Sequence, residues 1–187
     1  MVKERACIFI SGTGTNLKFI IKNSRDSNFP INIVLVVSNN NKAFGISYAK
    51  KFSIPYKVIP YDKRKFETIA MKELRDKKIK LVCLAGFMKI LSKNFVRDFK
   101  GKIINIHPSL LPKYKGLNTY KRALKNREKV TGCTVHYVDD KLDNGRPIIK
   151  KRVWILKNDN EIDLKKKVQR EEHKAYSEAI RKVYASI

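Results

Sequence analysis

Residues 103–116 read I-I-N-I-H-P-S-L-L-P-K-Y-K-G and decide how the chain is interpreted. The first part is an apolar strand in which Asn105 and His107 occupy alternate positions, so both side chains face the same way. Pro108 ends the strand because proline has no backbone donor. Open α/β sheets carry their chemistry at the carboxyl ends of buried strands, which makes this amide and imidazole a candidate site. The alternative is a hydrogen-bonded core histidine beside a turn asparagine.

Length and composition predict one domain with a sizeable core. The chain has 187 residues, of which 43% are hydrophobic, and no apolar run is long enough to span a membrane. Residues 1–5 lead directly into a strand-like run without the features of a signal peptide. Cys7, Cys83 and Cys133 are odd in number and far apart, as expected for small core residues in a reducing compartment. We therefore expect a cytoplasmic protein.

The formal net charge of +25 admits two interpretations. One is binding to nucleic acid or an anionic membrane; the other is an enzyme with anionic substrates. The basic residues are spread over nearly every expected helix, and the densest runs lie apart, at 63–65, 77–78 and 165–167. No nucleic-acid-binding motif accompanies them. Nucleic-acid binding is therefore the minor hypothesis.

Apolar runs alternate with amphipathic ones through most of the chain, which predicts β-α-β units and a parallel sheet. The expected strands are 5–11, 31–38, 55–60, 79–85, 103–106, 131–138 and 146–156. The expected helices start at about 17, 43, 62, 92, 118 and 161. The third should bury Phe66, Ile69, Ala70 and Leu74, and the last, to about residue 184, should bury Val168, Ala175, Tyr176, Ala179, Ile180 and Val183. The 131–138 and 146–156 strands form a hairpin-like excursion, so the sheet should be mixed.

A glycine-rich turn, S-G-T-G-T-N at 11–16, joins the first strand to the first helix. Such a turn presents backbone N–H groups and a helix N-terminus to a phosphate, and Thr15 and Asn16 would add side-chain donors or helix caps. The turn is neither a Walker loop nor a complete dinucleotide fingerprint. A tight structural turn is an equally good explanation of this stretch alone.

Asp143, in the acidic loop 139–145, could complete an acyl-transfer site with Asn105 and His107. An amide and a protonated imidazole stabilise an oxyanion, and a nearby carboxylate raises a histidine pKa and helps to move protons. The alternative is a turn aspartate, which is common before Asn-Gly.

Six segments, in order, make the chain resemble the phosphoribosylglycinamide formyltransferase (GAR transformylase) family of folate-dependent enzymes. They are S-G-T-G-T-N-L at 11–17, S-N-N-N-K-A-F-G at 38–45, L-A-G-F-M-K-I-L-S at 84–92, I-N-I-H-P-S-L-L-P-K-Y-K-G at 104–116, T-G-C-T-V-H-Y-V-D-D-K-L-D-N-G at 131–145 and V-Q-R-E-E-H-K-A-Y at 168–176. The resemblance implies a Rossmann-like formyltransferase fold, with a mostly parallel, twisted sheet of about seven strands, helices on both faces and a long C-terminal helix. It implies one domain, with a phosphate-binding half at 1–100 and a catalytic, folate-binding half at 101–187.

The activity implied by the resemblance is formyl transfer from 10-formyltetrahydrofolate to the amine of 5-phosphoribosylglycinamide in purine biosynthesis. The amine would attack directly, without an acyl-enzyme and without a metal. Asn105 and His107 would hold the oxyanion, with His107 as general acid. Asp143 would raise the His107 pKa and order a water that shuttles protons.

The same resemblance assigns the binding residues. Gly14, Thr15 and Asn16 would hold the ribose phosphate, and Glu172 would meet the amino end of the acceptor. The residues expected to contact the folate are Lys63, Arg64, Met88, Lys89, Ile90, Leu91, Asn105 and Asp143. The alternative for Met88, Ile90 and Leu91 is ordinary core, and for Glu172 a solvated helix face.

Four positions depart from the family pattern. Arg146 looks like a one-residue insertion directly after the Asp143 loop, which puts the geometry around Asp143 in question. Thr15 replaces the usual serine and keeps the hydroxyl. Asn118 and Tyr120 replace the usual histidines, a change that nothing in the sequence explains.

Two other classes of function compete with this interpretation. Methionyl-tRNA formyltransferases share H-P-S-L-L-P but are expected to be longer. Sugar-amine formyltransferases share the formyl chemistry but lack the S-G-x-G-[ST]-N opening. A non-catalytic, basic RNA-binding module on the same fold is the remaining alternative. The expected partners are small-molecule substrates, with no membrane, no nucleic acid, and a monomer or homodimer as the assembly.

Overall fold

The computed structural model describes residues 2–185, which fall into two compact units that meet in sequence between Ile104 and Asn105. The strands are β1 Glu4–Ile10, β2 Ile31–Ser38, β3 Tyr56–Val58, β4 Leu81–Leu84, β5 Lys102–His107, β6 Val130–Tyr137 and β7 Pro147–Trp154. The order of hydrogen-bonded strands is β3-β2-β1-β4 in the first unit, then β5, which holds residues of both units, then β6-β7 in the second.

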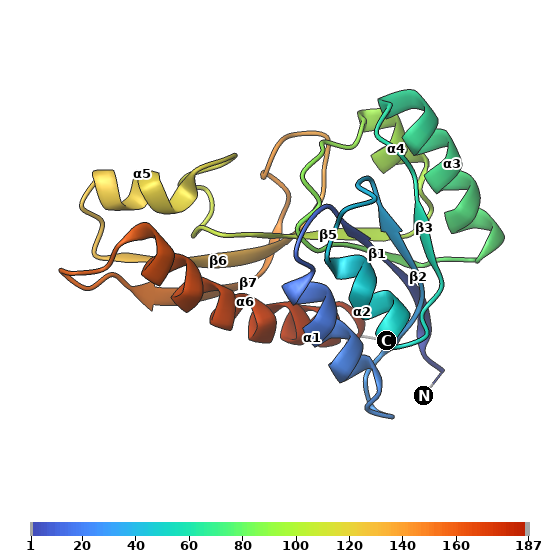
Figure 1. Ribbon diagram of the computed structural model, residues 1–187, viewed down its shortest axis with the longest axis horizontal. Coiled ribbons are helices and arrows are strands. Elements are labelled where there is room, and N and C mark those ends of the chain that lie inside the picture. Colours follow the sequence, from blue (N-terminus) through green and yellow to red (C-terminus); the bar gives the residue numbers. More distant parts are fainter. Residues whose placement is uncertain (1, 186–187) are drawn as a thin grey trace. The chain divides into compact units, whose positions relative to one another are not determined.

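The first unit is a parallel sheet covered on both faces. Strand β1 pairs in parallel with β2 and β4, and β2 with β3. Residues 6–10 of β1 are completely buried, as expected for a strand covered on both sides. Helices α1 and α2 lie on one face, and α3 and α4 lie on the other (Figure 1). Their bounds are α1 Thr15–Ser24, α2 Gly45–Lys51, α3 Lys63–Asp76 and α4 Lys93–Asp98.

Aromatic rings hold α3 and α4 against this sheet. The ring centroid of Phe9 lies 5.8 Å from Phe66, 5.4 Å from Phe87 and 6.4 Å from Phe95. Phe66 and Phe87 stack at 5.3 Å. The prediction that Ile69 is buried is wrong, because its side chain is 37% exposed while Phe66 is fully buried. Ile69 lies three positions from Phe66, at the margin of the apolar stripe.

Shortly after the ends of α2, α3 and α5 comes a residue other than glycine whose backbone is left-handed. These residues are Ser53, Lys78 and Arg127, with φ values of 53°, 50° and 50°. After α3, the N–H of Ile79 donates to the carbonyl of Leu74 at 2.9 Å and that of Lys78 to Arg75. This pattern satisfies the last carbonyls of the helix and requires a left-handed residue.

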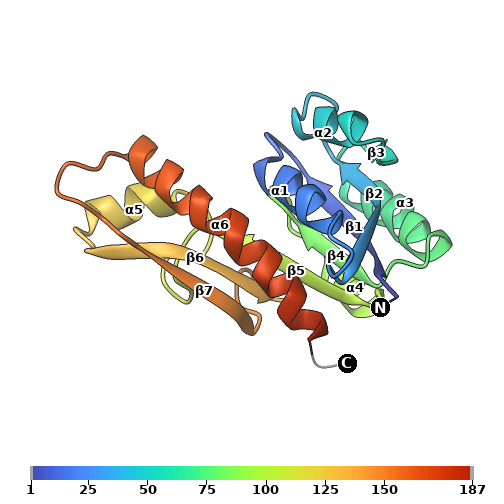
Figure 2. The same cartoon turned by 90° about the horizontal axis from the view of Figure 1, so that it is seen from below.

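The second unit is an antiparallel hairpin packed against helices. Strands β6 and β7 pair along their lengths, and α6 (Glu161–Tyr184) packs on both, with α5 (Thr119–Lys125) beside it (Figure 2). A capping box starts α6: the Asn160 side chain accepts from the Asp163 N–H, and the Asp163 side chain accepts from the Asn160 N–H. The six α6 residues expected inside are all buried. The long helix therefore covers the hairpin, and the short one packs against the long one.

The predicted fold class is confirmed in both units: three strand pairs are parallel, the hairpin is antiparallel, and a 24-residue helix follows. The third strand is shorter than expected, and α1 starts at Thr15, so Thr15 and Asn16 belong to its first turn and are not caps. The buried cysteines are free thiols, as expected. The assignment of functions to the two halves stays a prediction. Across residues 2–185, no helix is both long and apolar enough to cross a membrane.

The contrast between Phe66 and Ile69 is testable. We expect Phe66→Ala to lower the free energy of unfolding by about 3–5 kcal/mol, because it removes a fully buried ring from the aromatic cluster. Ile69→Ala, on the same helix, should cost less than about 1.5 kcal/mol, since that side chain is partly exposed. Urea unfolding measures both values. Equal losses would contradict the orientation of α3.

Candidate active site

His107, the last residue of β5, has a hydrogen-bond acceptor at each ring nitrogen. Its Nδ1 lies 3.2 Å from Oδ2 of Asp143, and the two side chains are only 7% and 8% exposed. Its Nε2 lies 2.8 Å from the carbonyl oxygen of Tyr114. A carboxylate and a carbonyl both accept, so both contacts are hydrogen bonds only when each ring nitrogen carries a proton. Each ring nitrogen therefore faces a group that can only accept a hydrogen bond.

Asp143 is placed by its backbone and by a second donor. Its φ of 47° lies in the left-handed region, which aspartate tolerates better than most residues. Its Oδ2 also accepts from the N–H of Gly116 at 2.9 Å. Asp143 is thus a turn residue whose side chain faces His107 and not solvent.

A second histidine, His136 on β6, completes the cluster and was missed by sequence reasoning. Its Nδ1 lies 2.8 Å from the carbonyl of Tyr137, and its Nε2 lies 3.2 Å from Nδ2 of Asn105. The carbonyl can only accept, so Nδ1 carries the proton and Nε2 accepts from the amide. His136 thereby fixes the orientation of the Asn105 amide, with Nδ2 toward the His136 ring. Burial lowers the pKa of His136, although Asp143, 3.8 Å away, acts in the opposite direction.

The Tyr114 carbonyl, which contacts Nε2 of His107, is held in place by the contacts of the Tyr114 side chain. The phenol donates to Oε1 of Glu128 at 2.8 Å and accepts from Nδ2 of Asn126 at 2.9 Å. The Arg122 guanidinium lies over the ring, 5.1 Å from its centroid. Tyr114 has a φ of 57°, an uncommon conformation for a bulky residue that these contacts hold in place.

The hairpin next to Arg146 has an irregular register that lies outside the site. Val135 of β6 pairs with Ile149 of β7, and the next β6 residue, His136, pairs with Pro147. Ile148 therefore has no partner in the ladder and forms a bulge in β7. The Arg146 guanidinium lies 5.1 Å from the ring centroid of Tyr137. A bulge accommodates one additional residue without changing the rest of the ladder. Asp143 still reaches His107.

In the first unit, the glycine-rich turn opens directly into α1. Gly14 is the N-cap residue, with φ 71°, and no side chain caps the helix. A Cβ on Gly14 would lie 2.4 Å from Cα of Gly45, so the turn requires glycine there. The first N–H groups of a helix without a side-chain cap are available to an anion.

The predicted folate residues of the first unit also gather in one region. Tyr61 lies just before α3; its hydroxyl is 3.5 Å from the carbonyl of Ile90, and the Lys89 ammonium lies 4.6 Å from its ring centroid. Met88 and Ile90 are 69% and 61% exposed, so the core alternative is wrong for these two side chains. Leu91 is 9% exposed and does belong to the core. Lys63 and Arg64, in the first turn of α3, are exposed.

Glu172 is 6% exposed, so the alternative of a solvated helix face is wrong. Its charge affects two neighbours in the second unit. Burial, with a smaller contribution from Glu172, raises the pKa of the Tyr120 phenol well above its ordinary value and that of the Cys133 thiol to about 12. Both groups are therefore neutral near pH 7.

The fold and this cluster agree with what the comparison of sequences shows. The profile of the formyl transferase family matches residues 4–180. The chain therefore belongs to the formyl transferase family.

Particular members of the family resemble the chain along nearly its whole length. The phosphoribosylglycinamide formyltransferase of Haemophilus influenzae is 37% identical over 178 residues, which cover 92% of this chain and 84% of that protein. A crystal structure of the enzyme of that name from Coxiella burnetii is 40% identical, has a TM-score of 0.91 and covers 99% of this chain and 89% of its own.

A longer relative matches the chain as one of its parts. The trifunctional purine biosynthetic protein adenosine-3 of Drosophila melanogaster is 41% identical over 184 residues, which are 95% of this chain and 14% of that protein. The chain thus spans about one seventh of the length of this relative.

The buried position of His136 predicts a pH dependence of stability. Its pKa is lower in the folded chain than the ordinary value of about 6.5 that applies when the chain is unfolded. The unfolded state therefore binds more protons as the pH falls through 6.5, and the contribution of His136 to stability, complete above that pH, is lost below it. We expect the stability difference between the wild type and His136→Gln to shrink between pH 7.5 and 5.5, as measured by urea unfolding. A difference that is independent of pH would contradict this expectation.

Proposed function

We propose that the chain transfers the formyl group of 10-formyltetrahydrofolate to the amine of 5-phosphoribosylglycinamide, as a step of purine biosynthesis. The observation that carries the proposal is the cluster of the buried His107 with the half-buried Asn105 and Asp143, in a chain of the formyl transferase family. The acceptor is inferred from two relatives named phosphoribosylglycinamide formyltransferase. The match to this chain covers 84% of one and 82% of the other.

Attack of the amine on the formyl carbon forms a C–N bond and moves negative charge onto the formyl oxygen. Two groups in the cluster suit that charge. One N–H of the Asn105 amide is directed to His136, which leaves the other for the oxyanion. The Nδ1–H of a protonated His107 can turn from Asp143 toward the same oxygen. A donor already held in place, as the Asn105 amide is by His136, stabilises such an oxyanion without reorganising.

Asp143 moves the proton that completes the transfer. The attacking nitrogen must lose a proton, and N10 of the folate must gain one as its bond to the formyl carbon breaks. A carboxylate beside an imidazolium accepts the first proton and returns it to the leaving nitrogen, directly or through a water. No acyl-enzyme is needed, because the acceptor amine is the nucleophile throughout.

The binding residues are proposed from the family resemblance. The ribose phosphate takes the N-terminus of α1, with Gly14, Thr15 and Asn16, and Glu172 receives the amino end of the acceptor. The folate contacts the exposed side chains of Met88 and Ile90, with Lys89, Leu91, Lys63 and Arg64 and with Asn105 and Asp143. We propose a cytoplasmic enzyme, as monomer or homodimer, that uses the folate as cosubstrate and no metal.

The first test is release of tetrahydrofolate from 10-formyltetrahydrofolate with phosphoribosylglycinamide as acceptor. We expect turnover, and a decrease in kcat of about 10²–10⁴-fold in Asp143→Asn, because the proton acceptor is lost. His107→Ala should lose turnover while binding of the ribonucleotide changes little. Equal loss of binding would mean that His107 is structural.

Methionyl-tRNA, offered as acceptor in a parallel reaction, tests the competing interpretation of the basic surface. Formylation of the tRNA without turnover of the ribonucleotide would overturn the proposed acceptor. Salt-sensitive RNA binding without any turnover would favour a binding module.

A matched pair of variants tests the phosphate loop. We expect Thr15→Val to raise KM for the ribonucleotide about tenfold or more, since a hydrogen bond to a charged group contributes about 1.5–3 kcal/mol. Thr13→Val, in the same loop but without a proposed contact, should leave KM within twofold. KM for the folate should not change in either variant. Similar KM values in both variants would contradict the assignment of Thr15.

A further inference from the structure

Ser11 directly follows β1, the strand that lies between β2 and β4 in the sheet of the first unit. In a parallel sheet, the loops that follow neighbouring strands emerge at the same edge. The loop after β2 begins with Asn39, and the segment after β4 contains Met88. The side chain of Ser11 contacts both of these residues.

The Ser11 hydroxyl donates to Oδ1 of Asn39 at 2.6 Å and accepts from the N–H of Met88 at 2.8 Å. A backbone N–H can only donate and an amide oxygen can only accept, so the direction of both hydrogen bonds is fixed. Each bond polarises the other, because the hydroxyl donates and accepts at once. A single oxygen therefore joins the loop after β2 to the segment after β4.

On the β2 side, the backbone of the glycine-rich turn is held as well. Nδ2 of Asn40 donates to the carbonyl of Ser11 at 3.2 Å, and the N–H of Gly45 donates to the carbonyl of Gly12 at 3.0 Å. The turn and the loop 39–45 therefore form one hydrogen-bonded body, from which the Ser11 hydroxyl reaches the segment after β4.

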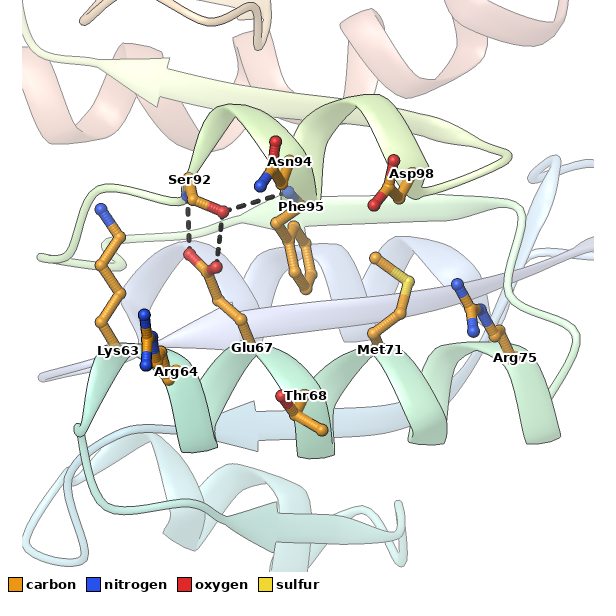
Figure 3. A pocket seen from close by; sticks show the side chains of 10 residues that line it. All are labelled: Lys63, Arg64, Glu67, Thr68, Met71, Arg75, Ser92, Asn94, Phe95 and Asp98. Carbon is orange, nitrogen blue, oxygen red and sulfur yellow. Dashed lines mark hydrogen bonds between the residues drawn. The ribbon is translucent and has the colours of Figure 1, made fainter.

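The segment 88–91 is fixed at its far end without Ser11. Glu67 of α3 accepts from the N–H of Ser92 at 2.6 Å and from its hydroxyl (Figure 3). The Ser92 hydroxyl in turn accepts from the N–H of Phe95 in α4 at 3.1 Å. The far end is thus attached to two helices.

At the near end of this segment, backbone hydrogen bonds continue the pairing of β1 and β4 as far as Gly86. The N–H of Ala85 donates to the carbonyl of Phe9 at 2.9 Å, and the N–H of Ser11 donates to that of Gly86 at 3.2 Å. Two residues further on, Met88 is held by the Ser11 side chain. Because the Met88 side chain is 69% exposed, packing does little to fix its backbone. The position of the near end therefore depends on the Ser11 hydroxyl.

We propose that Ser11 is a positioning residue through which the ribonucleotide and the folate bind with positive cooperativity, an inference that rests on the proposed function. The turn 11–16 is the proposed phosphate site, and 88–91 is the proposed folate segment. An anion bound at the N-terminus of α1 restricts the motion of the turn, and the hydroxyl restricts the N–H of Met88 with it. A folate that meets a segment already ordered loses less conformational entropy on binding. The coupling is reciprocal, so the folate raises the affinity for the ribonucleotide by the same factor.

Amide hydrogen exchange tests the link without turnover, with ribose 5-phosphate as the ligand of the turn. We expect saturating ribose 5-phosphate to slow exchange in the peptide 86–91 of the wild type by about threefold or more. Ser11→Ala should abolish this protection while the turn itself stays protected. Ser11→Thr keeps the hydroxyl and should keep the protection. Ser47→Ala, which removes an exposed hydroxyl from α2 of the same unit, should behave as the wild type.

Equilibrium titration measures the cooperativity itself. Tetrahydrofolate, which has no formyl group to transfer, is titrated with and without saturating phosphoribosylglycinamide. We expect the ribonucleotide to lower the Kd of tetrahydrofolate in the wild type by about five- to tenfold, a common size for such coupling. Ser11→Ala should reduce this ratio to less than about twofold. A purely structural role would instead weaken both Kd values and leave their ratio unchanged. Ser11→Thr and Ser47→Ala should keep the ratio.

Three results would overturn the link: a Kd ratio of one in the wild type, an equal loss of the ratio in Ser11→Ala and Ser11→Thr, or protection of 86–91 that survives in Ser11→Ala. Absence of protection in the turn would overturn it as well, because no anion would then bind there. A chain that shows no turnover with the ribonucleotide would refute the proposed formyl transfer. Protection of 86–91 by ribose 5-phosphate, lost in Ser11→Ala, would still support the link in that case.

Discussion

The carboxylate of Asp143 joins the parts of the second unit on which the proposed chemistry depends. One oxygen contacts His107 at the end of β5 and the Gly116 N–H in the turn that follows; the other faces His136 on β6. Each partner is uncharged or cationic, so a single buried negative charge is balanced where it lies. Removal of the carboxylate would take from His107 Nδ1 and from the Gly116 N–H the acceptor that each of them contacts. The arrangement of the strand end, the turn and the loop is thus one electrostatic unit.

Much of this arrangement follows from patterns that a sequence displays directly. The two-residue spacing of Asn105 and His107 in an apolar run predicts that they share a face, because strand side chains alternate. Ser92 before a short apolar segment predicts the start of α4, and its hydroxyl does accept from the N–H of Phe95. The continuous apolar run of β1 predicts burial on both faces. Asp143 was placed beside His107 through the family resemblance, since no local pattern brings residues 36 positions apart together.

The rest was decided by contacts that the sequence does not show. His136 lies in an alternating strand, and that pattern is the same for a core histidine and for one that orients an amide. The start of α1 depends on the left-handed conformation of Gly14, so Thr15 and Asn16 entered the helix and were not its caps. Ile69 fits the helical period as well as its buried neighbours do.

The helix ends at Ser53, Lys78 and Arg127 bear on how far this protein could be stabilised. Each backbone adopts a conformation that costs a side-chain-bearing residue about 1 kcal/mol and costs glycine almost nothing. None of the three is proposed to take part in catalysis or in substrate binding. At Ser53 and Lys78 the chain therefore retains a reserve of thermal resistance that an engineer, or selection in a hotter environment, could use without altering the chemistry. Arg127 is different, because its neighbours Asn126 and Glu128 hold Tyr114 in place.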